Sequence, residues 1–284
     1  MAAGDSITYG FFVDDADTYP AALESSLISS GVSVEVLNIG RGNISIDKEY
    51  AITRKALDLH PDIVLLTFTT NDITDLRGKN RNHLVSSSAQ LLTWRERLFK
   101  LLASTATGEF LFDASIGLIF ESYGVSRRDD APQGEDRYEI AGGNDYLANS
   151  EVFRGGFWDT DGLVLREPFP SEAEELVDNY LLVFEHMADF LATQKVRLVL
   201  AYSPAYSQIY KPGTSMKMRD ILKEAAAEKG AEFLDLTPVL KNAGADAVLH
   251  LAPLDFHPNP AGNRVMGEAV AEFLLERGLV STGP

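Results

Sequence analysis

Apolar positions along the chain follow two different periods, which indicates strands interleaved with helices. Ile63–Phe68 and Val196–Tyr202 are largely apolar runs with the length of a buried strand, and Val32–Leu37 alternates apolar and polar residues. Apolar residues recur at helical spacing after Ser171-Glu172-Ala173-Glu174, which has the form of a capping box. We therefore expect a long amphipathic helix beginning at Ser171.

The remaining periodic segments complete an α/β pattern. Further helices are expected over residues 18–30, 46–59, 216–229 and 260–276, and a further short strand over residues 231–236. Thr18 is the expected N-cap of the first of these helices, with Pro20 in its first turn. Strands that alternate with helices predict a mainly parallel sheet with helices on both faces.

The stretch from about residue 74 to residue 170 interrupts this rhythm. It combines an apolar helical pattern near Leu91–Leu102 with a run rich in glycine and aspartate. A structureless loop of that length is unusual in a compact domain, so we expect one domain over residues 1–284 with an inserted helical subdomain or lid. Phe153, Phe157 and Trp158 are expected to form either the core of that insertion or an apolar wall for a ligand.

Composition narrows the range of partners. Acidic residues outnumber basic ones by 42 to 25, for a net charge of −17, so the surface repels nucleic acid. The chain has no cysteine, no run of apolar residues long enough to span a membrane, and no histidine or carboxylate spacing typical of a zinc or calcium site. We expect no metal and no cofactor. Both the cytosol and secretion stay open as locations, since an upstream leader is compatible with this sequence, and the oligomeric state stays open too.

Three short polar segments carry the candidate chemistry. They are Gly4–Thr8, Thr69–Asp72 and Asp255–Asn259, and each falls at the boundary between a predicted strand or loop and a helix. Taken singly, each has an ordinary structural explanation: a helix-capping serine, a polar turn and a surface histidine. Because the carboxyl ends of parallel strands gather at one edge of a sheet, the three segments together predict one site.

The residue types in these segments suit acyl transfer. A serine hydroxyl such as that of Ser6 is a weak nucleophile until a base takes its proton, and His257 is the candidate base, with His250 as a rival. Asp255 is positioned in the sequence to orient the imidazole of His257. The amide of Asn71 is a candidate donor to the oxyanion that forms during acyl transfer.

The same segments resemble the conserved blocks of the GDSL/SGNH hydrolases. Gly4–Thr8 resembles the first block, and Asp255–Asn259 resembles the last. The resemblance implies a three-layer α/β/α fold with a flavodoxin-like sheet, a Ser6–His257–Asp255 triad, and an oxyanion hole formed by Ser6, Asn71 and the second block, Asn38–Asn43. By spacing, Asn43 stands where that block has its glycine, and it retains a backbone N–H and tolerates a left-handed conformation.

Three departures from the family pattern lead to expectations of their own. The family has a central strand directly before the first block, and three residues are expected to be too few to form it, so we expect an upstream segment or an unpaired sheet edge. Asp255 precedes His257 by two residues where three is commoner. Thr69 replaces the usual glycine of the third block and is expected to narrow the site.

The resemblance implies hydrolysis of a carboxylic ester through an acyl-enzyme intermediate. The expected substrate is a small-molecule ester, either a lipid or an acylated carbohydrate. Two alternatives stay open from the sequence: an O-acyltransferase that uses the same triad, and a catalytically silent module that binds a ligand on this scaffold.

Overall fold

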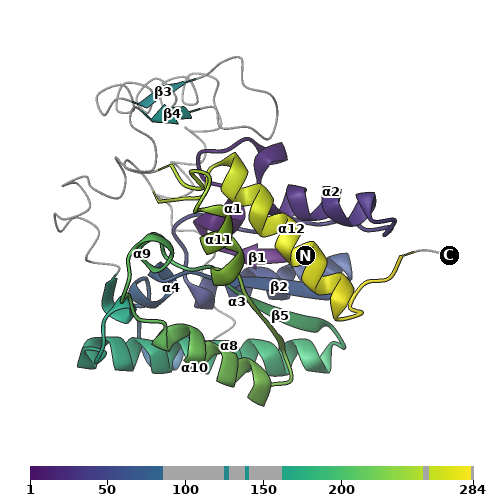
Figure 1. Cartoon of the computed structure of the whole chain (residues 1–284). Helices are drawn as coiled ribbons and strands as arrows, with labels where there is room; N and C mark the ends of the chain where they lie inside the picture. The colour runs from purple at the N-terminus through teal and green to yellow at the C-terminus, as the bar shows by residue number, and fades with distance from the viewer. Residues whose placement is uncertain (86–124, 128–137, 141–161, 252–255, 283–284) are drawn as a thin grey trace, which may run out of the picture.

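The computed structural model describes residues 1–85, 125–127, 138–140, 162–251 and 256–282. Its centre is a sheet of four parallel strands in the order β1-β2-β5-β6 (Figure 1). The strands are β1 (Ala2–Gly4), β2 (Ile63–Phe68), β5 (Arg197–Tyr202) and β6 (Glu232–Asp235). A separate antiparallel pair joins β3 (Val125–Arg127) to β4 (Tyr138–Ile140).

Helices cover both faces of the parallel sheet (Figure 1). The α-helices are α1 (Ser6–Tyr9), α2 (Tyr19–Ser29), α3 (Ile46–Ala56), α4 (Asn71–Thr74), α8 (Ser171–Thr193), α9 (Tyr206–Tyr210), α10 (Lys217–Glu228), α11 (Thr237–Ala243) and α12 (Pro260–Glu276). Short 3₁₀ turns lie at η1 (Asp15–Asp17), η2 (Leu57–Leu59), η3 (Arg81–His83) and η5 (Gly162–Leu165). The predicted three-layer α/β/α class is confirmed.

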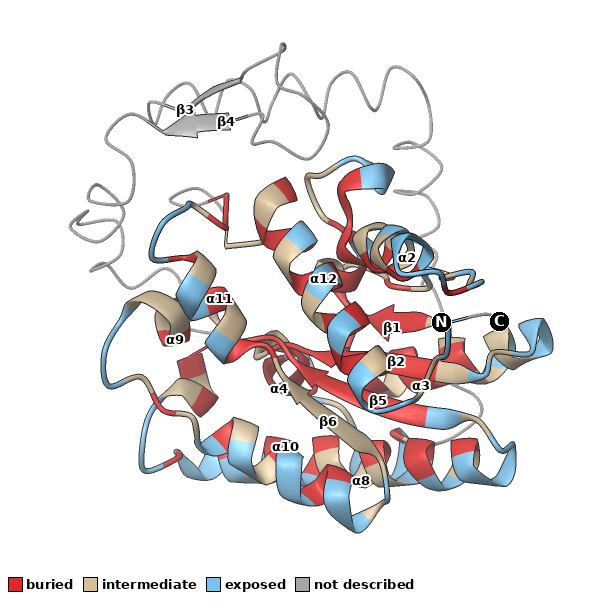
Figure 2. Cartoon of the chain, turned by 45° about the vertical axis from the view of Figure 1, so that its right-hand side comes forward, coloured by how far each residue is buried: buried red, intermediate tan, exposed pale blue. Residues whose placement is uncertain are grey.

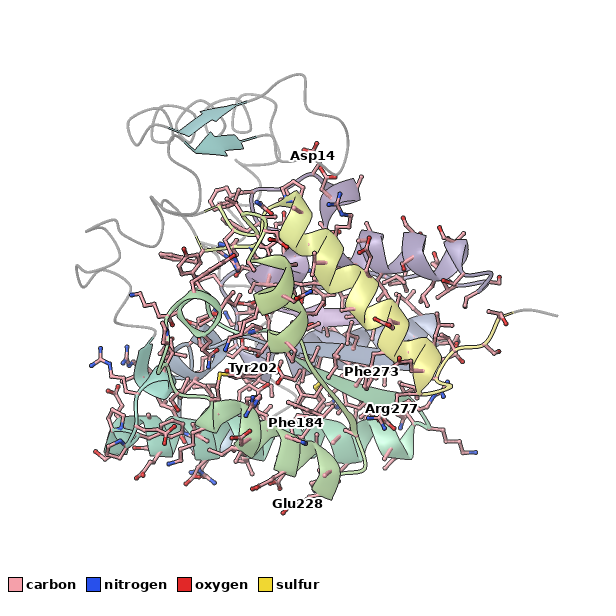
Figure 3. All side chains as sticks on the ribbon, in the orientation of Figure 1. Asp14, Phe184, Tyr202, Glu228, Phe273 and Arg277 are labelled. Carbon is pink, nitrogen blue, oxygen red and sulfur yellow. The ribbon has the colours of Figure 1, made fainter. Side chains whose placement is uncertain are left out.

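Alternation along the strands builds a separate apolar core on each face. Val64, Leu66 and Phe68 of β2 pack with α3, α8 and α10, whereas Leu65 packs with α2 and α12. In Figure 3, Phe184 of α8 and Phe273 of α12 mark the two helical layers on either side of the sheet. The strands are buried along most of their length except at the β6 edge (Figure 2), as expected for a sheet covered on both faces.

The short strand before Ser6 corrects one expectation. Ala2–Gly4 does form a strand, and it is paired on both sides: with β2, and with the segment around Asn38. The amide of Ala2 donates to Leu37 O at 2.8 Å, and that of Ile39 donates to Ala2 O at 2.9 Å. Three residues suffice because both neighbours supply backbone partners, so neither edge of β1 is unpaired.

The same pairing explains why the predicted strand Val32–Leu37 is wrong as a strand. Only its end reaches β1, through the bond from Ala2 N to Leu37 O beside the bridge between Ala2 and Asn38, and residues 32–37 belong to no strand. Alternation promotes a strand only where a neighbouring backbone is available. If the segment that ends at Asn38 is counted as the second strand along the chain, then β1, β2, β5 and β6 are the first, third, fourth and fifth. The order of these five across the sheet is then 2-1-3-4-5, which is flavodoxin-like, as predicted.

Most local predictions agree with the structure within one or two residues. The bounds of β2 and α12 are those expected, and Thr18 caps α2 by accepting a bond from Ala21 N at 3.4 Å. The capping box at Ser171 is wrong: Pro170 has the extended backbone before α8, so Ser171 is already the first helical residue.

The two ends of the predicted insertion belong to the sheet domain. Leu76 and Leu84 on one side, and Val164 and Phe169 on the other, are buried in the core that contains α8. The helix expected near Leu91–Leu102 and the aromatic residues at 153, 157 and 158 lie outside the described residues. An insertion, as a distinct unit, is thus confined to residues between 85 and 162, and its role as a lid stays a prediction.

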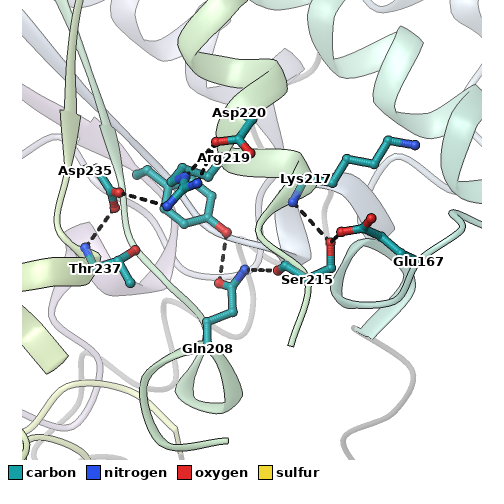
Figure 4. Close-up of polar contacts among 9 residues, drawn as sticks. Glu167, Gln208, Ser215, Lys217, Arg219, Asp220, Asp235 and Thr237 are labelled. Carbon is teal, nitrogen blue, oxygen red and sulfur yellow. Dashed lines mark hydrogen bonds and ion pairs between the residues drawn. The ribbon is translucent and has the colours of Figure 1, made fainter. Parts of the chain in front are cut away.

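A polar network fixes the loops at the carboxyl edge of the sheet (Figure 4). Gln208 of α9 accepts a hydrogen bond from the Tyr202 hydroxyl at 2.8 Å and donates to Ser215 O at 2.7 Å. Ser215 in turn donates from its hydroxyl to Glu167. Because Tyr202 and Gln208 are buried, these bonds satisfy polar atoms that would otherwise be costly, and they hold the chain after residue 162 against β5.

Candidate active site

Ser6 is held at the turn between β1 and α1. Asp5 caps α1 by accepting a bond from Ile7 N at 3.0 Å, and Ser6 is the first residue of the helix and half-buried. The turn requires Gly4, whose φ is 154° and where a Cβ would lie 2.1 Å from Thr8 Oγ1. The explanation of Ser6 as a capping residue is therefore wrong, since Asp5 has that role.

His257 approaches Ser6 from the far end of the chain. Its Nε2 lies 2.7 Å from Ser6 Oγ, across a sequence separation of 251 residues. The loop is fixed on both sides of the histidine: Leu251 N donates to His257 O at 3.0 Å, and Asn259 caps α12 through Gly262 N at 2.9 Å. These two bonds hold the backbone at His257 and at the start of α12.

Asn71 reaches the same place from the carboxyl end of β2. Its Nδ2 donates to Asp5 Oδ2 at 2.7 Å and to Asp75 Oδ2 at a longer 3.4 Å. The hydroxyl of Thr69 donates to Asn71 Oδ1 at 2.7 Å, so Thr69 fixes the direction of the amide. Asp5 Oδ2 also lies 3.2 Å from Ser6 Oγ, which links the Asn71 amide to the serine through one carboxylate.

The loop that carries Asn43 passes beside Ser6. Asn43 is exposed and left-handed, with φ 60°, a conformation that asparagine tolerates better than most residues. A Cβ at the preceding Gly42 would lie 3.9 Å from Ser6 Cβ, so this loop borders the serine. Gly40 lies against α1, where a Cβ would stand 2.5 Å from Tyr9 N, and this close approach brings the loop to the site.

Two further candidates occupy different positions. Asp255 lies outside the described residues, so its contact with His257 stays a prediction. His250, the rival base, is buried, and its ring packs edge-on against Tyr206 and Tyr210 at 5.4 and 5.8 Å. The imidazole that the structure brings to Ser6 is that of His257.

Solved structures share this arrangement of elements. The chain matches "Crystal Structure of TesA" at 14% identity and TM-score 0.51, over 96% of each chain. It matches a lipase/acylhydrolase from Enterococcus faecalis at 13% identity and TM-score 0.51, over 100% of this chain and 97% of that one. It matches the acetyl xylan esterase AlAXEase at 13% identity and TM-score 0.51, over 96% and 98%. The chain has the GDSL/SGNH hydrolase fold.

The other comparisons add no relatives: no family model matches the chain, and no curated protein matches it. At 13–14% identity, the structural matches establish the GDSL/SGNH fold alone. In the part of the chain that the structure describes, no three histidine or acidic side chains are grouped as metal ligands. Among those same residues, no helix has both the length and the apolar character of a membrane span.

A buried group of polar side chains lies behind the site and was missed by the sequence reasoning. Glu49 and Thr53 of α3, Asp72 of α4 and Tyr180 of α8 form this group, which we call the acid cluster; their exposed fractions are at most 2%. Both carboxylate oxygens of Glu49, together with Asp72 Oδ1, Thr53 Oγ1 and the Tyr180 hydroxyl, have no hydrogen-bond partner among the described residues. Glu49 and Thr53 are four residues apart on a helix, which was the one available sequence signal.

Electrostatics explains how the acid cluster is tolerated. Burial raises the pKa of Glu49 well above its ordinary value, and the nearby carboxylate of Asp5 adds to the effect. Burial likewise raises the pKa of Asp72, with Glu49 as the largest charged contributor. Two buried carboxylates, of which one raises the pKa of the other, do not both ionise readily, so the neutral forms are favoured.

Two aromatic side chains also contact the candidate base. The ring of Phe11 stacks on that of His257 with centroids 5.4 Å apart and planes 28° apart. Phe12 meets the same imidazole edge-on at 6.1 Å, and the two phenyl rings lie 4.6 Å apart. Sequence reasoning missed both residues, because nothing in a Phe-Phe pair near the N-terminus indicates a contact with residue 257.

Proposed function

We propose that this protein hydrolyses carboxylic esters, with Ser6 as nucleophile and His257 as general base. The observation that carries the proposal is the 2.7 Å contact between Ser6 Oγ and His257 Nε2 at the carboxyl edge of the sheet. A serine within hydrogen-bond reach of an imidazole is the arrangement that activates the hydroxyl for attack. The GDSL/SGNH fold supports this reading, because its solved examples include a lipase/acylhydrolase and an acetyl xylan esterase.

In the first step, Ser6 Oγ bonds to the carbonyl carbon of the ester while its proton moves to His257 Nε2. The carbonyl oxygen becomes an oxyanion, and the imidazolium then gives the proton to the departing alcohol as the C–O bond breaks. In the second step, water attacks the acyl carbon while His257 takes a proton from that water, and the imidazolium then returns the proton to Ser6 Oγ as the bond between Oγ and the acyl carbon breaks and the carboxylic acid leaves. Asp255 is the proposed partner that orients His257 and stabilises the imidazolium.

The proposed oxyanion hole consists of Ser6 N, Asn71 Nδ2 and the backbone N–H of Asn43. Asn71 suits this role because, among the described residues, its Nδ2 makes one short bond, to Asp5, and one long contact of 3.4 Å, to Asp75, which leaves one N–H weakly engaged. The left-handed backbone of Asn43, one residue after the glycine that borders Ser6, supports the second-block donor. A fixed donor of this kind typically contributes about 10²–10³ in rate.

The proposed substrate is a small-molecule ester, with either a lipid-like acyl chain or an acetylated carbohydrate. The inserted segment between residues 85 and 162 is proposed to shape the pocket for the acyl and alcohol groups. A panel of aryl esters of increasing acyl length, together with acetylated sugars, distinguishes the two classes. Addition of an alcohol as competing acceptor identifies an acyltransferase, because the acyl group then appears mainly on the alcohol.

The decisive experiment is covalent labelling. A fluorophosphonate probe is expected to attach to the intact protein at Ser6, located by mass spectrometry of the labelled peptide. Ser6→Ala is the test variant, and Ser33→Ala, at an exposed position on the surface, is the matched control. A folded sample that the probe leaves unmodified would overturn the proposal in favour of a silent binding module.

A further inference from the structure

The contact between His257 and Phe11 assigns the phenyl ring a part in the reaction. Phe11 follows the short helix that begins with Ser6, and its backbone N–H donates to Ser6 O at 3.1 Å. The same four-residue helix therefore positions the nucleophile and the ring that stacks on its base. Both interactions meet at one imidazole, with Ser6 at Nε2 and Phe11 on the face.

The loop that presents the two rings has a constrained backbone. Gly10 ends α1 in the left-handed region with φ 85°, and Phe12 follows with φ 64°. A left-handed conformation is unfavourable for a bulky residue and persists only where its surroundings enforce it. In this left-handed conformation, the ring of Phe12 makes edge-to-face contacts with the rings of both Phe11 and His257.

Gly42 leaves the space that Phe11 occupies. A Cβ at residue 42 would lie 3.0 Å from Phe11 Cε2 and 3.4 Å from Cδ2. The phenyl ring therefore lies between Gly42 and the imidazole, and a side chain at residue 42 would press against it. A ring held in this way is preorganised, which is what electrostatic stabilisation of a transient charge requires.

The face of a phenyl ring carries negative potential and attracts a cation stacked on it. His257 is neutral when it accepts a hydrogen bond from Ser6 and becomes a cation only when it has taken the proton. We propose that Phe11 stabilises the imidazolium of His257, and so favours the transition state over the resting enzyme. This inference rests on the proposed function. Phe11 is a positioning residue in this scheme, since it acts through His257 and not on the ester.

Replacement of Phe11 removes no charged or titratable group from the surroundings of His257. Asp5 lies behind Ser6, Asp14 and Asp15 follow Phe12 on the loop, and Asp255 precedes His257 in the sequence. Tyr206 contacts Phe256, the residue adjacent to His257, and its ring also meets His250. A change in the pKa of His257 when Phe11 alone is substituted is therefore attributed to loss of the phenyl ring.

The test replaces Phe11 by leucine, which keeps an apolar side chain and removes the π-face. We expect the pKa of the His257 imidazole to fall by about 0.5, and kcat for a short aryl ester to fall about threefold with KM nearly unchanged. Phe11→Trp is expected to restore or raise both values, because indole is the stronger partner for a cation. Phe233→Leu, in the sheet strand β6, is the matched control.

The imidazole is followed by NMR titration of the full-length protein, with the His257 signal assigned from its loss in His257→Gln. An unchanged titration midpoint in Phe11→Leu would overturn the inference and leave Phe11 as packing. This outcome is separable from failure of the proposed function, since the NMR titration needs no turnover. If the fluorophosphonate probe labels Ser6 but the titration midpoint of His257 is the same in Phe11→Leu, only the role of Phe11 is refuted. If the probe does not label Ser6 in the folded protein, the proposed hydrolase function is refuted.

Discussion

Two neighbouring groups of carboxylates in this molecule have very different surroundings. At the candidate active site, Asp5 is a well-partnered acceptor that receives bonds from Ile7 N and Asn71 Nδ2, and its Oδ2 lies 3.2 Å from Ser6 Oγ. In the acid cluster behind it, Glu49 has no hydrogen-bond partner among the described residues, and Asp72 receives one bond, from Thr69 N at 2.9 Å. The carboxyl group of Asp5 thus organises neighbouring donors through hydrogen bonds, whereas the neutral form is favoured for the carboxyl groups of Glu49 and Asp72.

The two groups of carboxylates are expected to affect different properties of the protein, the one turnover and the other stability. Ser6 and His257, around which the polar groups of the candidate site are arranged, are both partly exposed to solvent. The side chains of the acid cluster come from α3, α4 and α8 and are buried; this burial raises the pKa of both Glu49 and Asp72, and the charge of Asp5 at the site raises it further. Substitutions at the candidate site should therefore change turnover, whereas substitutions in the acid cluster should change mainly the free energy of unfolding.

The largest expected effect is at the serine and its base. Ser6→Ala and His257→Ala are each expected to lower kcat for an aryl acetate by at least about 10⁴-fold, because nucleophile and base act as a unit. Steady-state kinetics measures the loss, and far-UV circular dichroism verifies the fold. His186→Ala, at an exposed position on α8, is the control for the histidine. Substantial turnover in either variant would contradict the assignment of Ser6 as nucleophile and His257 as base.

Asn71 tests the link between the two regions, since it bonds to Asp5 and precedes Asp72. Asn71→Ala is expected to lower kcat about 10²–10³-fold with a small change in KM, because an oxyanion donor acts in the transition state. A loss of stability of about 1–3 kcal/mol should accompany it, since buried Asp5 loses one donor. Exposed Asn82→Ala is the control. An unchanged kcat would show that the oxyanion is bound elsewhere.

The smallest effect on turnover is expected in the acid cluster, where pH dependence provides the measurement. The folded chain raises the pKa of Glu49 well above 4.5, so it holds a proton that the unfolded chain has released. Stability should therefore fall as pH rises from about 4.5 toward the folded pKa, and then level off. Glu49→Gln is neutral at every pH, so this part of the decline should disappear.

Urea unfolding at a series of pH values measures the difference. Glu49→Gln and the native chain should have similar stability below about pH 4.5, and the variant should be more stable at neutral pH. Glu268→Gln, at an exposed position on α12, should leave the curve unchanged. Equal slopes in all three proteins would show that Glu49 is ionised in the folded state.

The local elements of this fold were predictable from the sequence. The bounds of β2 and α12, and the cap at Thr18, follow from hydrophobic period and helix-terminal chemistry within about ten residues. These patterns depend on residues that are close in the sequence, so they can be interpreted without knowledge of the fold. The fold class followed in turn, because alternating helices and strands have few ways to bury their apolar faces.

Pairing between distant segments was not predictable in the same way. Ala2–Gly4 became a strand because β2 and the backbone around Asn38 flank it, whereas most of Val32–Leu37 stayed unpaired although its alternation is the clearer pattern. For the site, the motifs identified Ser6, Asn71 and His257, but their distances depend on strand order and loop geometry.

The sequence alone determined which side chains were available for chemistry, since residue types and their positions beside predicted strands are local properties. Only the tertiary structure decided which of them meet: Phe11 on the face of His257, Thr69 on Asn71, and Glu49 near enough to buried Asp72 to raise its pKa. The physical reason is that stacking, hydrogen bonding and desolvation depend on distances in space. No pattern along the chain encodes the distance between residues that the fold brings together from far apart.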